Sequence, residues 1–338
     1  MWSEGIETQV LPFLEAQREQ KVFNFGVLGF LSPQKDFLLW KVGDDFDVDA
    51  VFDLASLTKC APTSTLALQQ IVAGKLKVDD AVQKWLPELR MSHAEQIKVW
   101  HLLTHTLDYR LPMSSLKDLS PVEILDVLFG YEFNLAPGLE FNYGNPASVL
   151  LGLLLERLLD DSLSALADLH IFSPLQMDSS TYEPLAKISP HRIVLTERCP
   201  WRQKDLRGIV HDESAYALQR PVGSAGVFAC ATDLLKLLRY YLWENPPLLA
   251  LVSRNELSHL GGQGTTLGWE LSNPRFMGTN VGPQTFGKTG FTGMSMVAEP
   301  LKNIGVVWLC DFTWPQREKS VERIFALRRS LHEKIWDI

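Results

Sequence analysis

The sequence has few cysteines, no run of basic residues and no long apolar segment. Its four cysteines are scattered, without the Cys-x-x-Cys spacing of a metal or redox motif. A net charge of −8 and the lack of basic runs argue against nucleic acids and anionic membranes as partners. The longest apolar segment, Val149–Leu155, is far shorter than the ~20 residues of a membrane-spanning helix. We therefore expect neither a nucleic-acid partner nor a membrane span.

The N-terminal residues lack the basic segment followed by an apolar segment that is typical of a secretory signal peptide. Scattered cysteines, interpreted as free thiols, suit a reducing compartment. Both features predict a cytoplasmic protein, and a periplasmic location is left open if a leader has been removed. His101 and His105 are four residues apart, but no Glu stands between them as in a His-Glu-x-x-His motif and no third ligand is evident. We expect no metal and no cofactor.

Apolar and alternating segments near both chain ends predict strands of one antiparallel sheet. The predicted strands are residues 21–30, 36–42, 267–271, 284–288, 294–299 and 304–311. Amphipathic segments at the two ends, the second over residues 317–335, predict helices that flank this sheet. The middle of the chain is mostly helical in pattern. These features predict an α+β fold (an α/β sandwich) with a large, mostly helical insertion.

The chain length fits one catalytic unit, residues 1–338. Within it we expect a sheet region formed by residues 1–58 and 258–338, and a mostly helical region over residues 59–257. Residues 185–222 are polar and show little periodicity, which predicts a long loop.

A Ser-x-x-Lys pattern occurs three times, and only Ser56–Lys59 has a promising context. Ser32–Lys35 contains a proline, and Ser114–Lys117 lies in a polar segment. Ser56 begins a helical pattern, so Lys59 is one turn away and can take its proton, while free backbone N–H groups can hold an oxyanion. A helix cap followed by a solvated lysine is the alternative. Pro62 predicts either a kinked helix or a separate turn before a regular helix.

Two further patterns carry polar groups that could meet at this serine. Tyr143 and Asn145 are two residues apart on a predicted loop, and Lys288-Thr289-Gly290 ends a predicted strand. Taken singly, each has a structural alternative, a tyrosine at a helix start or a solvated lysine. Together they place an amine, a phenol and a second amine around one serine, which can pass a proton without a histidine.

The three patterns, in this order and spacing, resemble those of the serine β-lactamase and penicillin-binding-protein superfamily. The similarity is greatest to the branch with class C β-lactamases, D-alanyl-D-alanine carboxypeptidases and β-lactamase-like esterases. It covers about residues 21–315 and includes the segments VFDLASLTK, VWHLLTHT, PGLEFNYGN and FGKTGFTG. The resemblance implies a β-lactamase/transpeptidase-like fold and a hydrolase that works through an acyl-enzyme.

Residue by residue, the resemblance implies that Ser56 is the acylated nucleophile and Lys59 a base. Tyr143 would pass a proton to the leaving group and help activate the deacylating water. Lys288 would bias Tyr143 electrostatically.

The resemblance also implies the substrate-binding groups. Lys288 and Thr289 would hold a substrate carboxylate, and Asn145 would bond the amide side chain of the substrate. The backbone N–H groups of Ser56 and Phe291 would form the oxyanion hole. The expected partner is thus a small-molecule or peptide substrate, which can carry a carboxylate.

The motifs leave the substrate open among a β-lactam, a D-amino-acid peptide and a small ester. They also leave open a penicillin-binding receptor that is acylated but turns over slowly, and a noncatalytic relative. One departure concerns the HLLTHT segment, which usually continues with Ser-Gly in the family and here continues with Leu107-Asp108.

Overall fold

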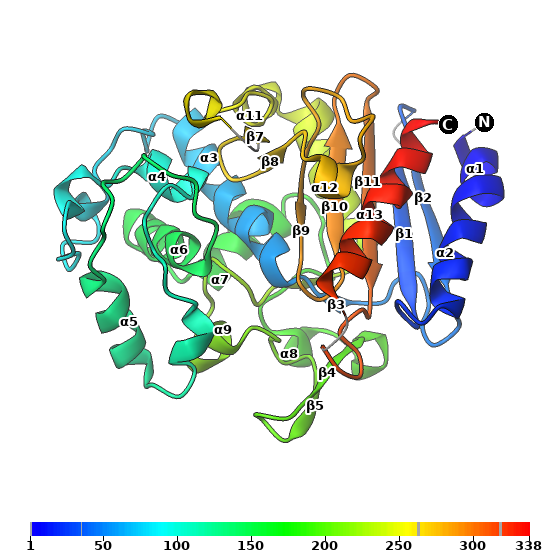
Figure 1. Cartoon of the computed structure of the whole chain (residues 1–338), viewed down its shortest axis with the longest axis horizontal. Helices are drawn as coiled ribbons and strands as arrows, with labels where there is room; N and C mark the ends of the chain where they lie inside the picture. Colours follow the sequence, from blue (N-terminus) through cyan, green and yellow to red (C-terminus); the bar gives the residue numbers. More distant parts are fainter. Residues whose placement is uncertain (1, 35, 262–263, 318–319) are drawn as a thin grey trace.

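The computed structural model describes residues 2–34, 36–261, 264–317 and 320–338. Its largest feature is a seven-stranded antiparallel sheet with the order β2-β1-β11-β10-β9-β8-β7 (Figure 1). Two small antiparallel pairs, β3–β6 and β4–β5, lie outside it. The strands are β1 (Gly26–Leu31), β2 (Phe37–Val42), β3 (Phe52–Asp53), β4 (Leu195–Cys199), β5 (Lys204–Arg207), β6 (Phe228–Ala229), β7 (Gly264–Thr265), β8 (Glu270–Leu271), β9 (Phe286–Thr289), β10 (Ser295–Glu299) and β11 (Ile304–Cys310).

Helices cover both faces of the large sheet, so its central strands are buried on both sides. Along β11 (Ile304–Cys310), Val306 and Trp308 pack into a core with the terminal helices. Their neighbours Val307 and Leu309 pack into the larger core shared with the helical part of the chain. This two-residue alternation is that of a strand with two apolar faces.

The terminal helices α1 (Trp2–Gly5), α2 (Leu11–Glu19) and α13 (Val321–Trp336) lie together on one face, and the two chain ends meet at one edge (Figure 1). Helix α10 (Ala231–Arg239) packs on the other face, where Gly29 leaves space for Leu235. The remaining helices are α3 (Thr65–Val72), α4 (Val99–Thr104), α5 (Pro121–Gly130), α6 (Asn145–Leu159), α7 (Leu163–Ala167), α8 (Pro184–Lys187), α9 (Glu213–Ala217), α11 (Pro246–Val252) and α12 (Pro274–Met277). No described helix is both long and apolar enough to cross a bilayer.

The structure confirms the predicted α+β class, with strands from both chain ends in one sheet and helices between them. The prediction of a long loop over residues 185–222 is wrong. That segment contains α8, α9 and the β4–β5 hairpin, which projects from the molecule (Figure 1). The hairpin was missed because its two short strands are rich in charged residues, one of which, Glu197, is buried. Lys35, in one discounted Ser-x-x-Lys pattern, lies outside the described residues, and the division into sheet and helical regions stays a prediction.

Candidate active site

Ser56 lies in a short 3₁₀ turn, Ala55–Lys59, rather than in a long helix. The backbone leaves the helical region at Ala61 (φ −117°, ψ 83°), and the regular helix α3 begins only at Thr65. Of the two alternatives that Pro62 raised, the separate turn is the correct one. The turn still brings the Nζ of Lys59 to 2.9 Å from the Oγ of Ser56.

The ammonium of Lys59 has three acceptors around it and is almost fully buried. It donates to Ser56 Oγ at 2.9 Å, to Asn145 Oδ1 at 2.8 Å and to the carbonyl of Ser224 at 2.9 Å. A lysine ammonium has three donors and no acceptor. Each of the three acceptors can therefore receive one N–H donor of Lys59.

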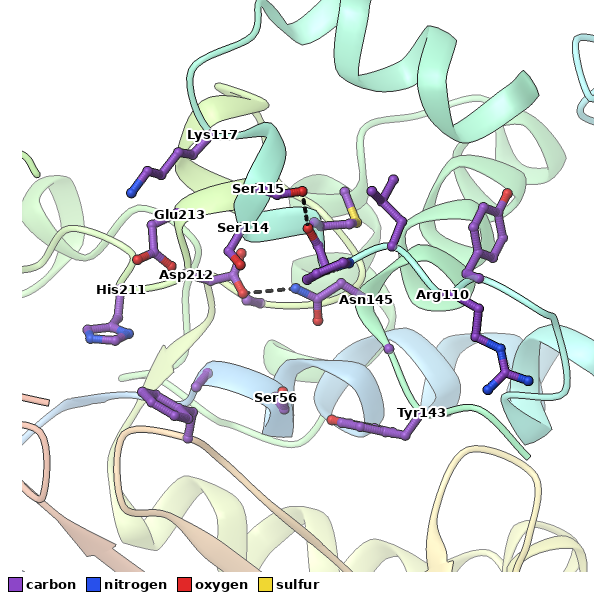
Figure 2. Close-up of a pocket in the computed structure, with 18 of the residues that line it drawn as sticks. Ser56, Arg110, Ser114, Ser115, Lys117, Tyr143, Asn145, His211, Asp212 and Glu213 are labelled. Atoms are coloured by element: carbon purple, nitrogen blue, oxygen red, sulfur yellow. Dashed lines mark hydrogen bonds between the residues drawn. The ribbon is translucent and has the colours of Figure 1, made fainter. Parts of the chain in front are cut away.

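The amide of Asn145 is held in one orientation by residues of another segment. Its Nδ2 donates to Asp212 Oδ2 at 2.9 Å and to Ser214 Oγ at 3.3 Å (Figure 2). Asp212 Oδ1 in turn accepts from the backbone N–H of Ala215 and caps α9. Asp212 thus turns the amide oxygen of Asn145 toward Lys59. Both polar ends of Asn145 contact protein groups, so it supports Lys59 in addition to its predicted role on the substrate.

Tyr143 precedes α6, and its hydroxyl points toward Ser56 (Figure 2). The ring is 44% exposed, and its centre is 4.2 Å from Lys288 Nζ and 5.4 Å from Lys59 Nζ. Burial of the hydroxyl acts to raise the pKa of Tyr143, but the two ammonium groups and a hydrogen bond with Ser56 outweigh it and lower that pKa below 10. The phenolate is therefore easier to form here than in water.

Lys288 lies on β9, buried between Tyr143 and a carboxylate on the neighbouring strand β8. Its Nζ donates to Glu270 Oε1 at 3.1 Å. Burial acts to lower the pKa of Lys288, but Tyr143 and Glu270 raise it to about 12. Lys288 is therefore charged at neutral pH, and much of its charge is balanced by Glu270.

The predicted oxyanion donors lie at the ends of two segments that approach closely. Among the described residues, neither the N–H of Ser56 nor that of Phe291 has a hydrogen-bond acceptor. A Cβ on Gly290 would lie 2.5 Å from the carbonyl oxygen of Leu54, so only glycine permits this approach. Two free backbone donors beside a serine hydroxyl suit a developing oxyanion.

Two cavities meet at Ser56, Tyr143 and Phe291. The larger, of about 900 Å³, lies over Ser56, with Arg110 at one end and His211 and Glu213 at the other (Figure 2). Its wall includes Ser114 and Lys117, the ends of a discounted Ser-x-x-Lys pattern, on a 3₁₀ turn. The smaller, of about 210 Å³, lies between Thr289 at the end of β9 and the first turns of α13. The predicted site residues thus converge on one place with substrate space on both sides.

His105 packs behind Tyr143, with ring centres 4.9 Å apart. Burial, with further contributions from Lys288 and Lys59, lowers its pKa well below 6.5, so the ring is neutral. His101 accepts a hydrogen bond from the backbone of Lys98. The described residues contain no group of three His, Cys, Asp or Glu side chains arranged to hold a metal ion.

The sequence reasoning missed Ser224, Asp212 and Glu270. The position of Asp212 before a short helix was a signal for a helix cap, but not for its contact with Asn145. Glu270 lies 18 residues before Lys288 in the chain, on the neighbouring strand, and no local sequence pattern reveals their pairing.

The profile of the beta-lactamase family matches residues 39–328. The chain belongs to the beta-lactamase family. This membership confirms the resemblance that the three motifs predicted. Relatives of this family member include the N-acetylmuramyl-L-alanine amidase of Bacillus subtilis (27% identical, covering 77% of the chain and 68% of the relative). The putative D-alanyl-D-alanine carboxypeptidase of Escherichia coli is 28% identical, and the match covers 77% of this chain and 69% of the relative.

Solved structures confirm the fold of this beta-lactamase family member. The beta-lactamase/D-alanine carboxypeptidase from Pseudomonas syringae superposes with a TM-score of 0.73 at 18% identity, covering 97% of this chain and 98% of that one. EstCE1, a hydrolase with promiscuous acyltransferase activity, superposes with a TM-score of 0.71 at 20% identity, covering 95% of this chain and 98% of that one. The predicted β-lactamase/transpeptidase-like fold is therefore confirmed.

Proposed function

We propose that the protein is a serine hydrolase that cleaves an ester or amide bond through an acyl-enzyme on Ser56, with the whole chain acting as one catalytic unit. The observation that carries the proposal is the contact of 2.9 Å between Lys59 Nζ and Ser56 Oγ beside a tyrosine of lowered pKa. Membership of the beta-lactamase family and relatives named as a carboxypeptidase and an amidase support it.

In the acylation step, Tyr143 as phenolate removes the proton of Ser56, and Lys59 donates a hydrogen bond to Ser56 Oγ. This assignment differs from the role of base that the resemblance implies for Lys59, because the Nζ of Lys59 already donates to three acceptors, Ser56 Oγ among them. Ser56 Oγ attacks the carbonyl carbon, and the oxyanion receives hydrogen bonds from the N–H groups of Ser56 and Phe291. Tyr143 then gives its proton to the leaving group.

Deacylation repeats these steps with water in place of the serine. Tyr143, again as phenolate, takes a proton from water, and the hydroxide attacks the acyl carbon. The tetrahedral intermediate collapses and Ser56 leaves with the proton. Throughout this cycle Lys288 stabilises the phenolate electrostatically.

The substrate class we propose is a small ester, a β-lactam or a D-amino-acid peptide. A carboxylate on the substrate can contact Thr289, but Lys288 is already paired with Glu270. We therefore propose that a carboxylate is accepted and is not required. Four free, buried cysteines support the cytoplasm as the location.

The test compares product release with acylation. The protein is mixed with an excess of nitrocefin, benzylpenicillin or p-nitrophenyl butyrate, and both the intact mass of the protein and the absorbance of the product are followed. We expect a transient acyl adduct and many turnovers per protein with at least one reagent. One turnover followed by a lasting adduct would favour the penicillin-binding receptor. The absence of both an adduct and turnover with all three reagents would contradict the proposal.

A further inference from the structure

One buried cation beside the site has no part in the catalytic cycle above. Arg328 lies on α13, is only 2% exposed, and lines the smaller cavity together with Ser56 and Tyr143. None of the ion pairs among the described residues involves Arg328, and its Nε has no hydrogen-bond partner. Burial lowers its pKa to about 10. A buried charge without a counter-charge is destabilising, so its presence needs an explanation.

The polar contact of this guanidinium is with the backbone of the active site. Arg328 Nη2 donates to the carbonyl oxygen of Gly290 at 2.6 Å. That oxygen belongs to the same peptide group as the N–H of Phe291, the predicted oxyanion donor. The N–H of Gly293 also donates to it, at 3.2 Å.

The residue before this peptide group is anchored as well. The N–H of Gly290 donates to the carbonyl of Met294 at 2.9 Å, and its Cα lies against Leu54. The plane of the 290–291 peptide is therefore fixed from the carbonyl side, by a cation and a backbone donor. The N–H of Phe291 lies in the same plane and points away from the carbonyl, and it has no acceptor among the described residues.

A cation at a carbonyl oxygen changes the opposite end of the amide group. A charge-assisted hydrogen bond draws electron density from the nitrogen to the oxygen and makes the N–H a stronger donor. Fixing the plane also removes the reorganisation that the donor would otherwise undergo when negative charge develops. Both effects favour the transition state over the bound substrate.

We propose that Arg328 is a positioning residue that orients and polarises the Gly290–Phe291 peptide, so that the Phe291 N–H stabilises the oxyanion. The proposal rests on the proposed function, because it concerns the oxyanion of an acyl-transfer reaction. Arg328 acts through the peptide and does not need to touch the substrate. A structural role in the packing of α13 is the alternative to be tested.

The decisive variant is Arg328→Met, which keeps a long apolar side chain and removes the charge. Removing a buried charge that has no counter-charge also removes the cost of its desolvation, and the Gly290 carbonyl keeps its hydrogen bond from Gly293. We therefore expect an unchanged or higher melting temperature together with a kcat for p-nitrophenyl butyrate about tenfold lower or more, given that loss of a whole oxyanion donor costs about 10²–10³. KM should change less than twofold, because the ground state does not use the effect.

A second readout isolates the oxyanion. Phenylboronic acid forms a tetrahedral anion on an active serine, so its inhibition constant should rise in Arg328→Met by the same factor by which kcat/KM falls. Arg328→Gln keeps a donor and loses the charge, and should fall between the parent and the Met variant in both measurements. It also serves as the test if Arg328→Met does not fold.

Arg275→Met is the matched control. Arg275 lies on α12 over the ring of Phe325, at 3.9 Å, which Arg328 also approaches from 5.3 Å. It pairs with Glu322 at the surface and is not part of either cavity. We expect parental kcat and boronate inhibition in this variant.

Parental kcat and boronate inhibition in both Arg328 variants would overturn the proposal. So would a fall in melting temperature with a boronate inhibition constant that does not change, which indicates a structural role. If the parent protein forms no adduct on Ser56 with any reagent, the proposed function fails first and this inference fails with it.

Discussion

Lys288 donates to Glu270 at 3.1 Å on one side and lies 4.2 Å from the centre of the Tyr143 ring on the other. Its charge is thus divided between a carboxylate that balances it and a phenol that it helps to ionise. Glu270 itself acts to raise the pKa of Tyr143. This pair therefore sets the pH at which Tyr143 becomes a base.

The first prediction concerns the pH profile of kcat/KM, whose rising limb should report ionisation of Tyr143. Glu270→Gln removes a negative charge, so the pKa of Tyr143 falls and the limb moves to lower pH. Lys288→Met removes a positive charge, so the limb moves to higher pH and the rate at pH 7 decreases.

Tyr143→Phe should lower kcat by about 10²–10⁴ at every pH, since it removes the general acid–base group.

The control for these variants is their melting temperature, because a buried charge left alone destabilises the fold. The double variant of Lys288→Met and Glu270→Gln removes both charges and should recover the stability that Lys288→Met loses. A limb that stays in place in both single variants would show that another group than Tyr143 titrates.

The second prediction concerns Asp212, which orients Asn145 and through it Lys59. Asp212→Ser keeps an oxygen that can cap α9 but cannot reach the Asn145 amide. A hydrogen bond to a charged group contributes about 1.5–3 kcal/mol, so kcat should fall roughly ten- to hundredfold. Steady-state kinetics at fixed pH measure this change.

The matched control is Ser162→Ala, which removes the cap of α7 and changes no residue of the two cavities at Ser56. It should reduce stability by about 1 kcal/mol with parental kcat. If Asp212→Ser loses stability without any loss of kcat, Asp212 is only a helix cap.

The third prediction concerns stability in acid. Burial, with a smaller contribution from Arg328, lowers the pKa of His332 to about 3, and burial with Lys98 lowers that of His101 to about 4. Their pKa in the unfolded chain is near 6.5. Between these values the unfolded chain binds protons that the folded chain does not, so the free energy of unfolding decreases as the pH falls below about 6.5.

Each of these histidines contributes a slope of about 1.4 kcal/mol per pH unit within its window. The free energy of unfolding of His332→Gln, measured in urea at pH 6, 5 and 4, should therefore change with pH by about 1.4 kcal/mol per unit less than that of the parent. Glutamine keeps a partner for Ser295 Oγ, which lies 3.3 Å from His332 Nε2. An unchanged slope would mean that His332 already binds a proton in the folded protein.

Much of the fold follows from local sequence patterns. The short apolar segments 304–311 and 294–299 predict β11 and β10 within a residue or two, because both faces of these strands are buried. The β4–β5 hairpin could not be predicted, because its pairing is held by tertiary neighbours such as Thr313, which donates to the carbonyl of Thr196. A separate turn at Ser56 was one of two predicted alternatives, and sequence alone could not decide between them or predict its 3₁₀ geometry.

The same division applies to the site. Ser56, Lys59, Tyr143 and Lys288 could be named from three short motifs. The groups that orient and balance them come from distant segments and follow no spacing. Arg328 did leave a signal, since it falls on the apolar stripe of α13 between Leu327 and Leu331, where a charged side chain is unexpected.

The measurement that tests the central claim most directly is the mass of the Ser56 peptide after rapid acid quenching of a reaction with p-nitrophenyl butyrate or benzylpenicillin. The account predicts an acyl group on that peptide in the parent and in Tyr143→Phe, where it should form and decay more slowly. It predicts no adduct in Ser56→Ala. An adduct on another residue, or full turnover by Ser56→Ala, would contradict the account.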